Sequence, residues 1–281
     1  VRDIMLMDSV ITGIKHDLKE ASAVTGLLKG LRIAAPPDWI AADKFANKTT
    51  AVSWEASIGA LTEQGVEVVR ENMGEEMFMK TGFANFFKSS WKELDAYLEA
   101  HRRSGAKHEA LELSTQDFVA QSPKGEDKVF RPPNEDPEKA KAEADGLDAV
   151  VKAAEEAIAG YFAKTDARFM LTPAMAGLPP NVEKATFDGH VTVTGQRLVA
   201  ETMSDEEAPM GLLMRYAARW AGMLPSIAIP TPVKCQATGL PTGVILWGRK
   251  DSDAELLQAA AAVEAAFTGH IDVWKHLDVQ Y

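Results

Sequence analysis

Residues 225–248 read PSIAIPTPVKCQATGLPTGVILWG, and this stretch decides the fold that the sequence predicts. It contains two short apolar runs, PSIAIP and TGVILWG, which are separated by a loop with proline and glycine at its ends. Short apolar runs between such residues are typical of buried strands. We therefore expect two neighbouring strands, with Cys235, the only cysteine of the chain, in the loop that joins them.

A helix is predicted directly after the second strand. Ser252 and Glu255 match the S-x-x-E pattern, in which a serine and a glutamate cap the first turn of a helix. The apolar residues that follow recur at helical spacing and predict a buried stripe: Leu256, Ala260, Val263 and Phe267.

Strands and helices also alternate in the earlier part of the chain. Residues 30–35 and 66–71 read as strands, and the segment between them has apolar residues at helical spacing and ends at Gly65. Such a strand–helix–strand unit normally places two parallel strands in one sheet. A helix over 137–163 and a buried strand over 168–171 continue the pattern. The sequence therefore predicts an α/β fold, a three-layer α/β/α sandwich with a mixed, largely parallel sheet.

We expect residues 1–281 to form a single domain. Residues 75–163 are predicted to be a helical and loop-rich subregion of it that covers the substrate side. The helix expected over 75–101 has a face of methionine, phenylalanine and tryptophan, which either packs in the core or lines an apolar substrate tunnel. The opening segment VRDIMLMDSVITG reads as an amphipathic helix, and its apolar face carries Ile4, Met7, Ile11 and Ile14.

Composition argues against several classes of partner and location. The 281 residues carry a formal charge of −11, which disfavours nucleic acid or an anionic membrane as the partner. No run of about 18 apolar residues occurs, so no transmembrane helix is predicted. A single cysteine fits a reducing compartment, and we expect the protein to be cytoplasmic.

Common cofactor and catalytic patterns are missing from the sequence. It contains no glycine-rich phosphate loop, and its histidines lack metal-ligand spacing, so we expect no cofactor and no metal. Ser89 follows Lys88, but adjacent residues on a helix point away from one another, which disfavours a Ser–Lys pair there. Cys235 is open to two interpretations, a nucleophile or a small side chain that fills a loop.

The C-terminal stretch resembles the end of the amidase signature family. GMLPSIAIP, a short loop and GLPTGVILWGRKDSDAELLQAAAAVE are similar to the family's closing pattern. LKGLRIAAP and RFMLTPAMAGLPP are similar to two earlier segments, in the same order. VRDIMLMDSVITG resembles the helix that follows the family's catalytic core. The resemblance implies that this chain is the C-terminal portion of such a domain.

The resemblance also implies a chemistry, amide hydrolysis by a Ser–cis-Ser–Lys triad through an acyl-enzyme. In the family the triad and its Gly-Gly-Ser-Ser-Gly-Gly stretch lie upstream of the segment matched by residues 1–13, and nothing like that stretch occurs here. We therefore assign no catalytic residue to this chain and expect it to be inactive alone. Its expected partners are a small-molecule amide and the N-terminal part of the same enzyme, and a homodimer is compatible with the sequence.

Two departures from the family pattern bear on the substrate. Trp220 stands where an asparagine is usual, and residues 212–214 are apolar where glutamine-specific amidotransferase subunits carry an acid. These side chains either pack in the core or favour a small amide with an apolar or aryl group, because they offer no charge partner. The alternatives are a glutamine-hydrolysing amidotransferase subunit and a non-catalytic α/β binding or scaffold protein. The residues expected to bind substrate are Leu213, Met214, Trp220, Thr231, Cys235, Phe83 and Phe87.

Overall fold

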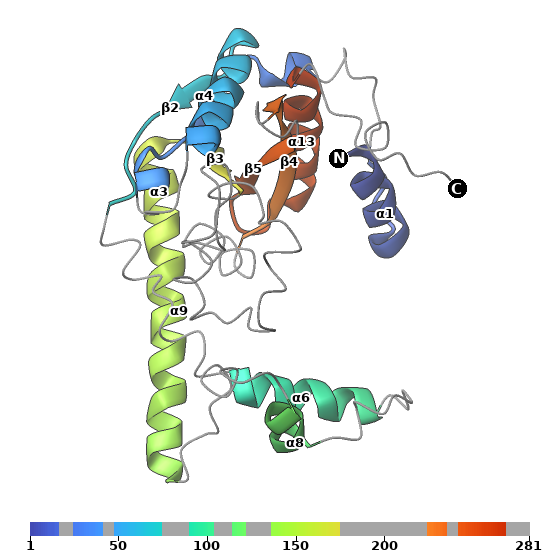
Figure 1. Ribbon diagram of the computed structural model, residues 1–281, viewed down its shortest axis with the longest axis vertical. Coiled ribbons are helices and arrows are strands. Elements are labelled where there is room, and N and C mark those ends of the chain that lie inside the picture. The colour runs from blue at the N-terminus through green and yellow to red at the C-terminus, as the bar shows by residue number, and fades with distance from the viewer. Residues whose placement is uncertain are drawn as a thin grey trace. The chain divides into compact units, whose positions relative to one another are not determined.

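The structure is a computed structural model of the chain, and it contains a five-stranded sheet with the strand order β2-β1-β3-β5-β4 (Figure 1). The strands are β1 (Arg32–Ala34), β2 (Glu67–Val69), β3 (Phe169–Pro173), β4 (Ser226–Lys234) and β5 (Pro241–Gly248). The residues that the structure describes are 1–16, 25–41, 48–74, 90–103, 114–121, 136–174, 224–234 and 241–267.

The strand directions confirm the predicted sheet. β1 pairs in parallel with β2 and with β3, whereas β5 pairs antiparallel with β3 and with β4. Four strands therefore run in the same direction, and β5 runs against them. The result is the mixed, largely parallel sheet of an α/β fold.

The two strands predicted within 225–248 are neighbours, as expected. β4 continues beyond the PSIAIP run to Lys234, and its register with β5 becomes irregular after Pro230. The irregularity has a local cause, because proline lacks the N–H that a regular ladder requires. The buried pairs that face each other across these strands are Ile227 with Leu246 and Ile229 with Val244.

Within the described residues, three helical elements contribute to the main hydrophobic core: η1 (Thr25–Leu28), α4 (Lys48–Glu63) and α13 (Asp253–Ala266). Both α4 and α13 contact β4 and β5. Gly65 follows α4 with a φ of 83°, a left-handed conformation that glycine adopts without strain, and its N–H donates to the Thr62 carbonyl. The buried stripe predicted for α13 is confirmed, because Leu256, Ala260, Val263 and Phe267 are all buried.

The second face of the sheet is also covered near its centre. Successive side chains of a strand point to opposite faces, so Ala34, Met170 and Trp247 form a row across β1, β3 and β5 on the face away from the main core. All three are completely buried. Coverage on both faces is what a sheet with parallel strands requires.

The chain divides into two compact units. The first contains residues 1–74, 158–180 and 203–281, and therefore the whole sheet. The second contains residues 75–157 and 181–202. Within the second unit, the Thr115 hydroxyl of α8 (Thr115–Gln121) donates to the Asp95 carboxylate of α6 (Ser90–Arg103) over 2.8 Å.

The long helix α9 (Pro137–Thr165) matches the helix predicted over 137–163 and extends it by two residues.

The capping box predicted at the start of α13 is wrong. Ser252 is the N-cap residue, but its side chain makes no capping hydrogen bond and donates instead to the Arg249 carbonyl over 2.6 Å. Glu255 does not reach back to the N-cap either, because its carboxylate pairs with Arg168 over 2.8 Å. The ion pair with Arg168, which lies outside the helix, thus replaces the capping contact that the local pattern predicted for Glu255.

Helix α1 (Arg2–Thr12) forms as predicted from the opening segment and ends at Gly13, which has a φ of 77°. Its Met5 side chain is buried at 2% exposure, whereas the predicted apolar face lies on the surface. Among the helices in the described part of the chain, none combines the length and the apolar character that crossing a bilayer requires.

Candidate functional site

The edge of the sheet at which β1, β2, β3 and β4 end is the candidate site. Ligands of α/β folds usually bind beyond the carboxyl ends of parallel strands, where the connecting loops gather. Residues 35–38, 70–74 and 174 follow these strands at this edge. The loop over 235–240 joins β4 to β5 at the same edge, and it lies outside the described residues.

Asp38 ties two of these connections together. It begins the short helix α3 (Asp38–Ala41) after β1. Its Oδ1 accepts a hydrogen bond from the N–H of Met73 over 3.0 Å, and its Oδ2 accepts one from the N–H of Gly74 over 2.8 Å. A carboxylate that accepts from backbone N–H groups makes strong, charge-assisted hydrogen bonds. One side chain thereby fixes the backbone after β2 relative to the backbone after β1.

Tyr161 adds a second tie to the segment after β2. Its hydroxyl donates to the Glu71 carbonyl over 2.6 Å, and Lys164, one turn of α9 later, forms an ion pair with the Glu71 carboxylate. Burial raises the pKa of the Tyr161 hydroxyl, and the negative charges of Asp38 and Glu71 raise it further. Tyr161 therefore stays protonated at neutral pH and serves as a hydrogen-bond donor.

Thr231 is the one predicted substrate-binding residue within the described part of the chain. It lies in β4 near the base of the 235–240 loop and is 1% exposed. Its hydroxyl oxygen lies 2.7 Å from Oγ1 of Thr242 in β5. This contact joins β4 to β5 near the ends from which the loop leaves them. Whether Thr231 also contacts substrate stays a prediction.

The other predicted substrate-binding residues lie outside the described residues: Phe83, Phe87, Leu213, Met214, Trp220 and Cys235.

A buried polar pair that the sequence analysis missed stabilises the centre of the sheet. Nε1 of Trp247 in β5 donates to Oγ1 of Thr172 in β3 over 2.8 Å, and both residues are completely buried. A buried indole N–H normally requires such a partner. The signal in the sequence was a tryptophan and a threonine in two apolar strands, but only the strand register brings the two together.

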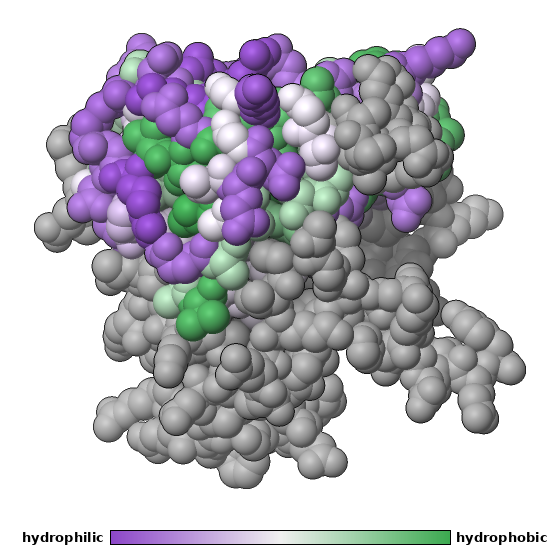
Figure 2. All heavy atoms as spheres, turned by 90° about the horizontal axis from the view of Figure 1, so that it is seen from above, coloured by the Kyte–Doolittle hydropathy of each residue, from purple (hydrophilic) through white to green (hydrophobic). Residues whose placement is uncertain are grey.

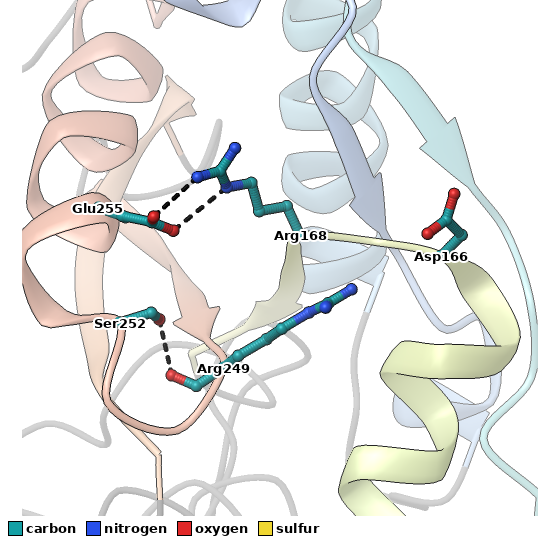
Figure 3. Close-up of a pocket in the computed structure, with 5 residues that line it drawn as sticks. All are labelled: Asp166, Arg168, Arg249, Ser252 and Glu255. Carbon is teal, nitrogen blue, oxygen red and sulfur yellow. Dashed lines mark hydrogen bonds and ion pairs between the residues drawn. The ribbon is translucent and has the colours of Figure 1, made fainter.

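The described residues also line an open hollow of about 400 Å³ at the opposite edge of the sheet (Figure 3). Arg168 and Glu255 point toward one another across it and form the ion pair described above, whereas Asp166 points away from them. Arg249 donates from Nε and Nη2 to the Ala167 carbonyl, over 3.2 and 2.6 Å. Arg168, Glu255 and Arg249 in this hollow are thus engaged with one another or with the backbone, and the ion pair of Arg168 with Glu255 connects the start of β3 to the start of α13.

Metal chemistry has no support in the described part of the chain. No group of three or more histidine, cysteine, aspartate and glutamate side chains there could hold a metal ion.

Comparison with solved structures identifies the fold. No family model matches the sequence, and a search of curated proteins finds no match. A bacterial aryl acylamidase belonging to the amidase signature enzymes superposes with a TM-score of 0.59 and 17% identity, over 92% of this chain and 47% of that one. A structure described as PAM12A gives a TM-score of 0.52 and 18% identity, over 89% of this chain and 46% of that one. An amidase gives a TM-score of 0.50 and 15% identity, over 94% of this chain and 50% of that one.

The chain therefore has the fold of the amidase signature enzymes, as the sequence resemblance implied. It spans about half the length of these solved structures, with 47% of the aryl acylamidase matched.

Proposed function

We propose that this chain forms part of an amidase that hydrolyses the C–N bond of a small hydrophobic, aryl carboxylic amide. The observation that carries the proposal is the likeness to the aryl acylamidase, which extends over 92% of this chain. The sequence resemblance supports it independently, because its segments occur in the family's order along the chain.

The proposed reaction passes through an acyl-enzyme. A lysine, acting through a bridging serine, takes the proton of a nucleophilic serine, and the serine oxygen attacks the amide carbonyl. Backbone N–H groups stabilise the oxyanion, the amine leaves with a proton, and water then hydrolyses the ester. The polypeptide that completes the fold would supply the serines and the lysine, so the 281-residue chain alone is inactive.

The role of this chain is to build the scaffold and part of the substrate pocket. Leu213, Met214 and Trp220 supply apolar pocket wall, which suits an aryl amide and offers no partner to the charged amino group of glutamine. Thr231 and Cys235 belong to the strand and loop at the carboxyl edge, and Phe83 and Phe87 add aromatic surface. The ties made by Asp38 and by Thr231 support a fixed geometry at that edge.

The test compares two substrates on the protein isolated from its native host through a C-terminal affinity tag. We expect kcat/KM for phenylacetamide to exceed that for glutamine by about tenfold or more, because an apolar pocket leaves the charged groups of glutamine without partners. The 281-residue chain alone should hydrolyse neither. Equal or reversed rates would contradict the aryl specificity, and the absence of hydrolysis of any amide would contradict the proposed function.

A further inference from the structure

The exposed face of α1 carries most of the large apolar side chains that are exposed in the described part of the first unit. Five apolar side chains of this helix are about half exposed or more: Ile4 at 46%, Leu6 at 47%, Met7 at 63%, Val10 at 86% and Ile11 at 77%. We call these five residues the α1 stripe. Ile14, just beyond the helix, is 52% exposed. Contiguous apolar patches on a protein surface mark interaction sites, whereas single exposed apolar residues need no explanation.

Elsewhere on the described part of the first unit, exposed large apolar side chains occur singly, as at Leu27 and Val52. Among the residues that are coloured in Figure 2, hydrophilic ones predominate on this face and hydrophobic ones occupy smaller areas. On α4, for example, Val52 is exposed at 51%, but Glu55, three residues later on the same helix face, is charged and exposed. The α1 stripe differs because consecutive turns of one helix present apolar side chains to the outside.

Helix α1 is held against its own unit by the opposite side. Met5 is 2% exposed, and Val1 packs against the main hydrophobic core. The Ser9 hydroxyl, on the same side as Met5, donates to the Met5 carbonyl over 2.9 Å. The helix is therefore anchored through the side opposite the stripe, and the stripe remains exposed and available to a partner.

The chemistry of α1 favours a polypeptide over a membrane. A helix that lies in a membrane surface normally carries Lys and Arg beside its apolar face. Helix α1 has Asp3 and Asp8 and a single basic residue, Arg2, and the whole chain has a formal charge of −11. An apolar stripe with acidic neighbours suits packing against another protein surface.

The structural comparison indicates which polypeptide that is. This chain is matched over 92% of its length by only 47% of the aryl acylamidase, so roughly half of that fold has no counterpart here. In a compact fold the two halves must bury apolar surface against each other, since apolar burial is the main stabilising force. The α1 stripe is an apolar surface of this kind on the present chain.

We propose that the α1 stripe is the docking surface for the polypeptide that supplies the remaining half of the amidase-type fold. The inference rests on the proposed function for the identity of that partner. It adds the place at which the partner binds: Leu6, Met7, Val10 and Ile11 enter a continuous core with it. The contact is the same whether that polypeptide is joined to this chain or is a separate subunit.

The test measures thiol labelling in the protein made in its native host from its own gene and isolated through a C-terminal tag. One variant carries Val10→Cys in the stripe, and the matched control carries Val52→Cys on α4. Maleimide modification of each introduced thiol is followed at the peptide level, so that Cys235 is read separately. The structure gives Val10 greater exposure than Val52, 86% against 51%, so with no partner the thiol of the Val10→Cys variant would react at least as fast.

We expect the opposite order. Docking should make Val10→Cys react about tenfold more slowly than Val52→Cys, because a buried thiol is shielded from the reagent. Native mass spectrometry of the same preparation should show mass beyond that of one 281-residue chain that is not a second copy. Labelling of Val10→Cys as fast as Val52→Cys would overturn the proposal. Slow labelling in a complex of two copies of this chain and nothing else would overturn it too.

The outcome is separable from that of the proposed function. Hydrolysis of phenylacetamide together with rapid labelling of Val10→Cys would refute the docking surface and leave the amidase assignment standing. Protection of Val10→Cys in a protein that hydrolyses no amide would support the docking surface and refute the amidase assignment.

Discussion

Helices α13 and α1 have the same kind of sequence pattern and opposite environments. Both show apolar residues at helical spacing, and both form where the pattern predicts them. The stripe of α13 is buried against strands of its own sheet, with Val263 and Phe267 at 0% exposure. The face of α1 is open, with Val10 at 86% and Ile11 at 77% exposure.

The difference teaches what helical periodicity can and cannot predict. Periodicity tells which side chains share a face, and a shared apolar face predicts that something covers it. For α13 the cover is encoded nearby, because β4 and β5 precede it directly in the sequence. For α1 none of the described residues of this chain covers the face. The following predictions test this contrast between a helix face that the chain buries and one that it leaves exposed.

The largest expected effect on the free energy of unfolding is in the buried stripe of α13. Phe267→Ala removes a fully buried ring at the end of the α13 stripe and should lower the free energy of unfolding by about 3–5 kcal/mol. Leu27→Ala is the control, because Leu27 is 50% exposed in η1 and should cost far less. Urea denaturation followed by circular dichroism measures both. Similar losses for the two variants would mean that the stripe of α13 is not part of the core.

The next effect concerns the carboxyl edge, where Asp38 ties the backbone after β2 to the backbone after β1. Asp38→Ala leaves the N–H groups of Met73 and Gly74 without their acceptor and should lower the free energy of unfolding by about 2 kcal/mol. Asp38→Asn keeps one amide oxygen and should lose less. Amide hydrogen exchange should quicken at Met73 and Gly74 in the alanine variant. Unchanged exchange at both positions would argue against the tie.

A smaller effect comes from Tyr161 and depends on pH. Unfolded tyrosine loses its proton near a pKa of about 10, whereas burial holds the pKa of Tyr161 above that value in the folded protein. Above that pH the unfolded state binds fewer protons, so the free energy of unfolding falls as pH rises. Tyr161→Phe should cost about 1 kcal/mol at neutral pH by losing the bond to the Glu71 carbonyl, and it should show a shallower decline above pH 10. Parallel pH profiles for the two proteins would contradict the buried hydroxyl.

The smallest effect is expected on the exposed face of α1. In the 281-residue chain, Ile11→Ala should change the free energy of unfolding by no more than about 0.5 kcal/mol, as expected for an exposed position. In the protein from its native host, the same substitution should cost clearly more, because Ile11 then lies in the interface with the partner. Equal effects in the two preparations would remove the contrast between the two helices.

The sequence predicted most of the sheet and little of the site. The apolar runs at 225–248 and 168–171 predicted β3, β4 and β5 because short buried strands between prolines and glycines leave a strong local signal. The bond between Trp247 and Thr172 could not be predicted, because residues 75 positions apart meet only through the strand register. The capping box failed for a similar reason, since the ion pair of Glu255 with Arg168 is a long-range contact. Thr231 was predicted as pocket wall, and its contact with Thr242 shows a structural role at the same edge.

Our central proposal is that this chain is the scaffold half of a serine-dependent amidase whose nucleophile lies in the other half. The most direct measurement is to treat the protein from its native host with a fluorophosphonate, which reacts with activated serines, and to locate the modified peptide by mass spectrometry. The account predicts a single modified serine that lies outside residues 1–281, together with loss of phenylacetamide hydrolysis. Modification of a serine within these residues, or full hydrolytic activity after exhaustive treatment, would contradict it.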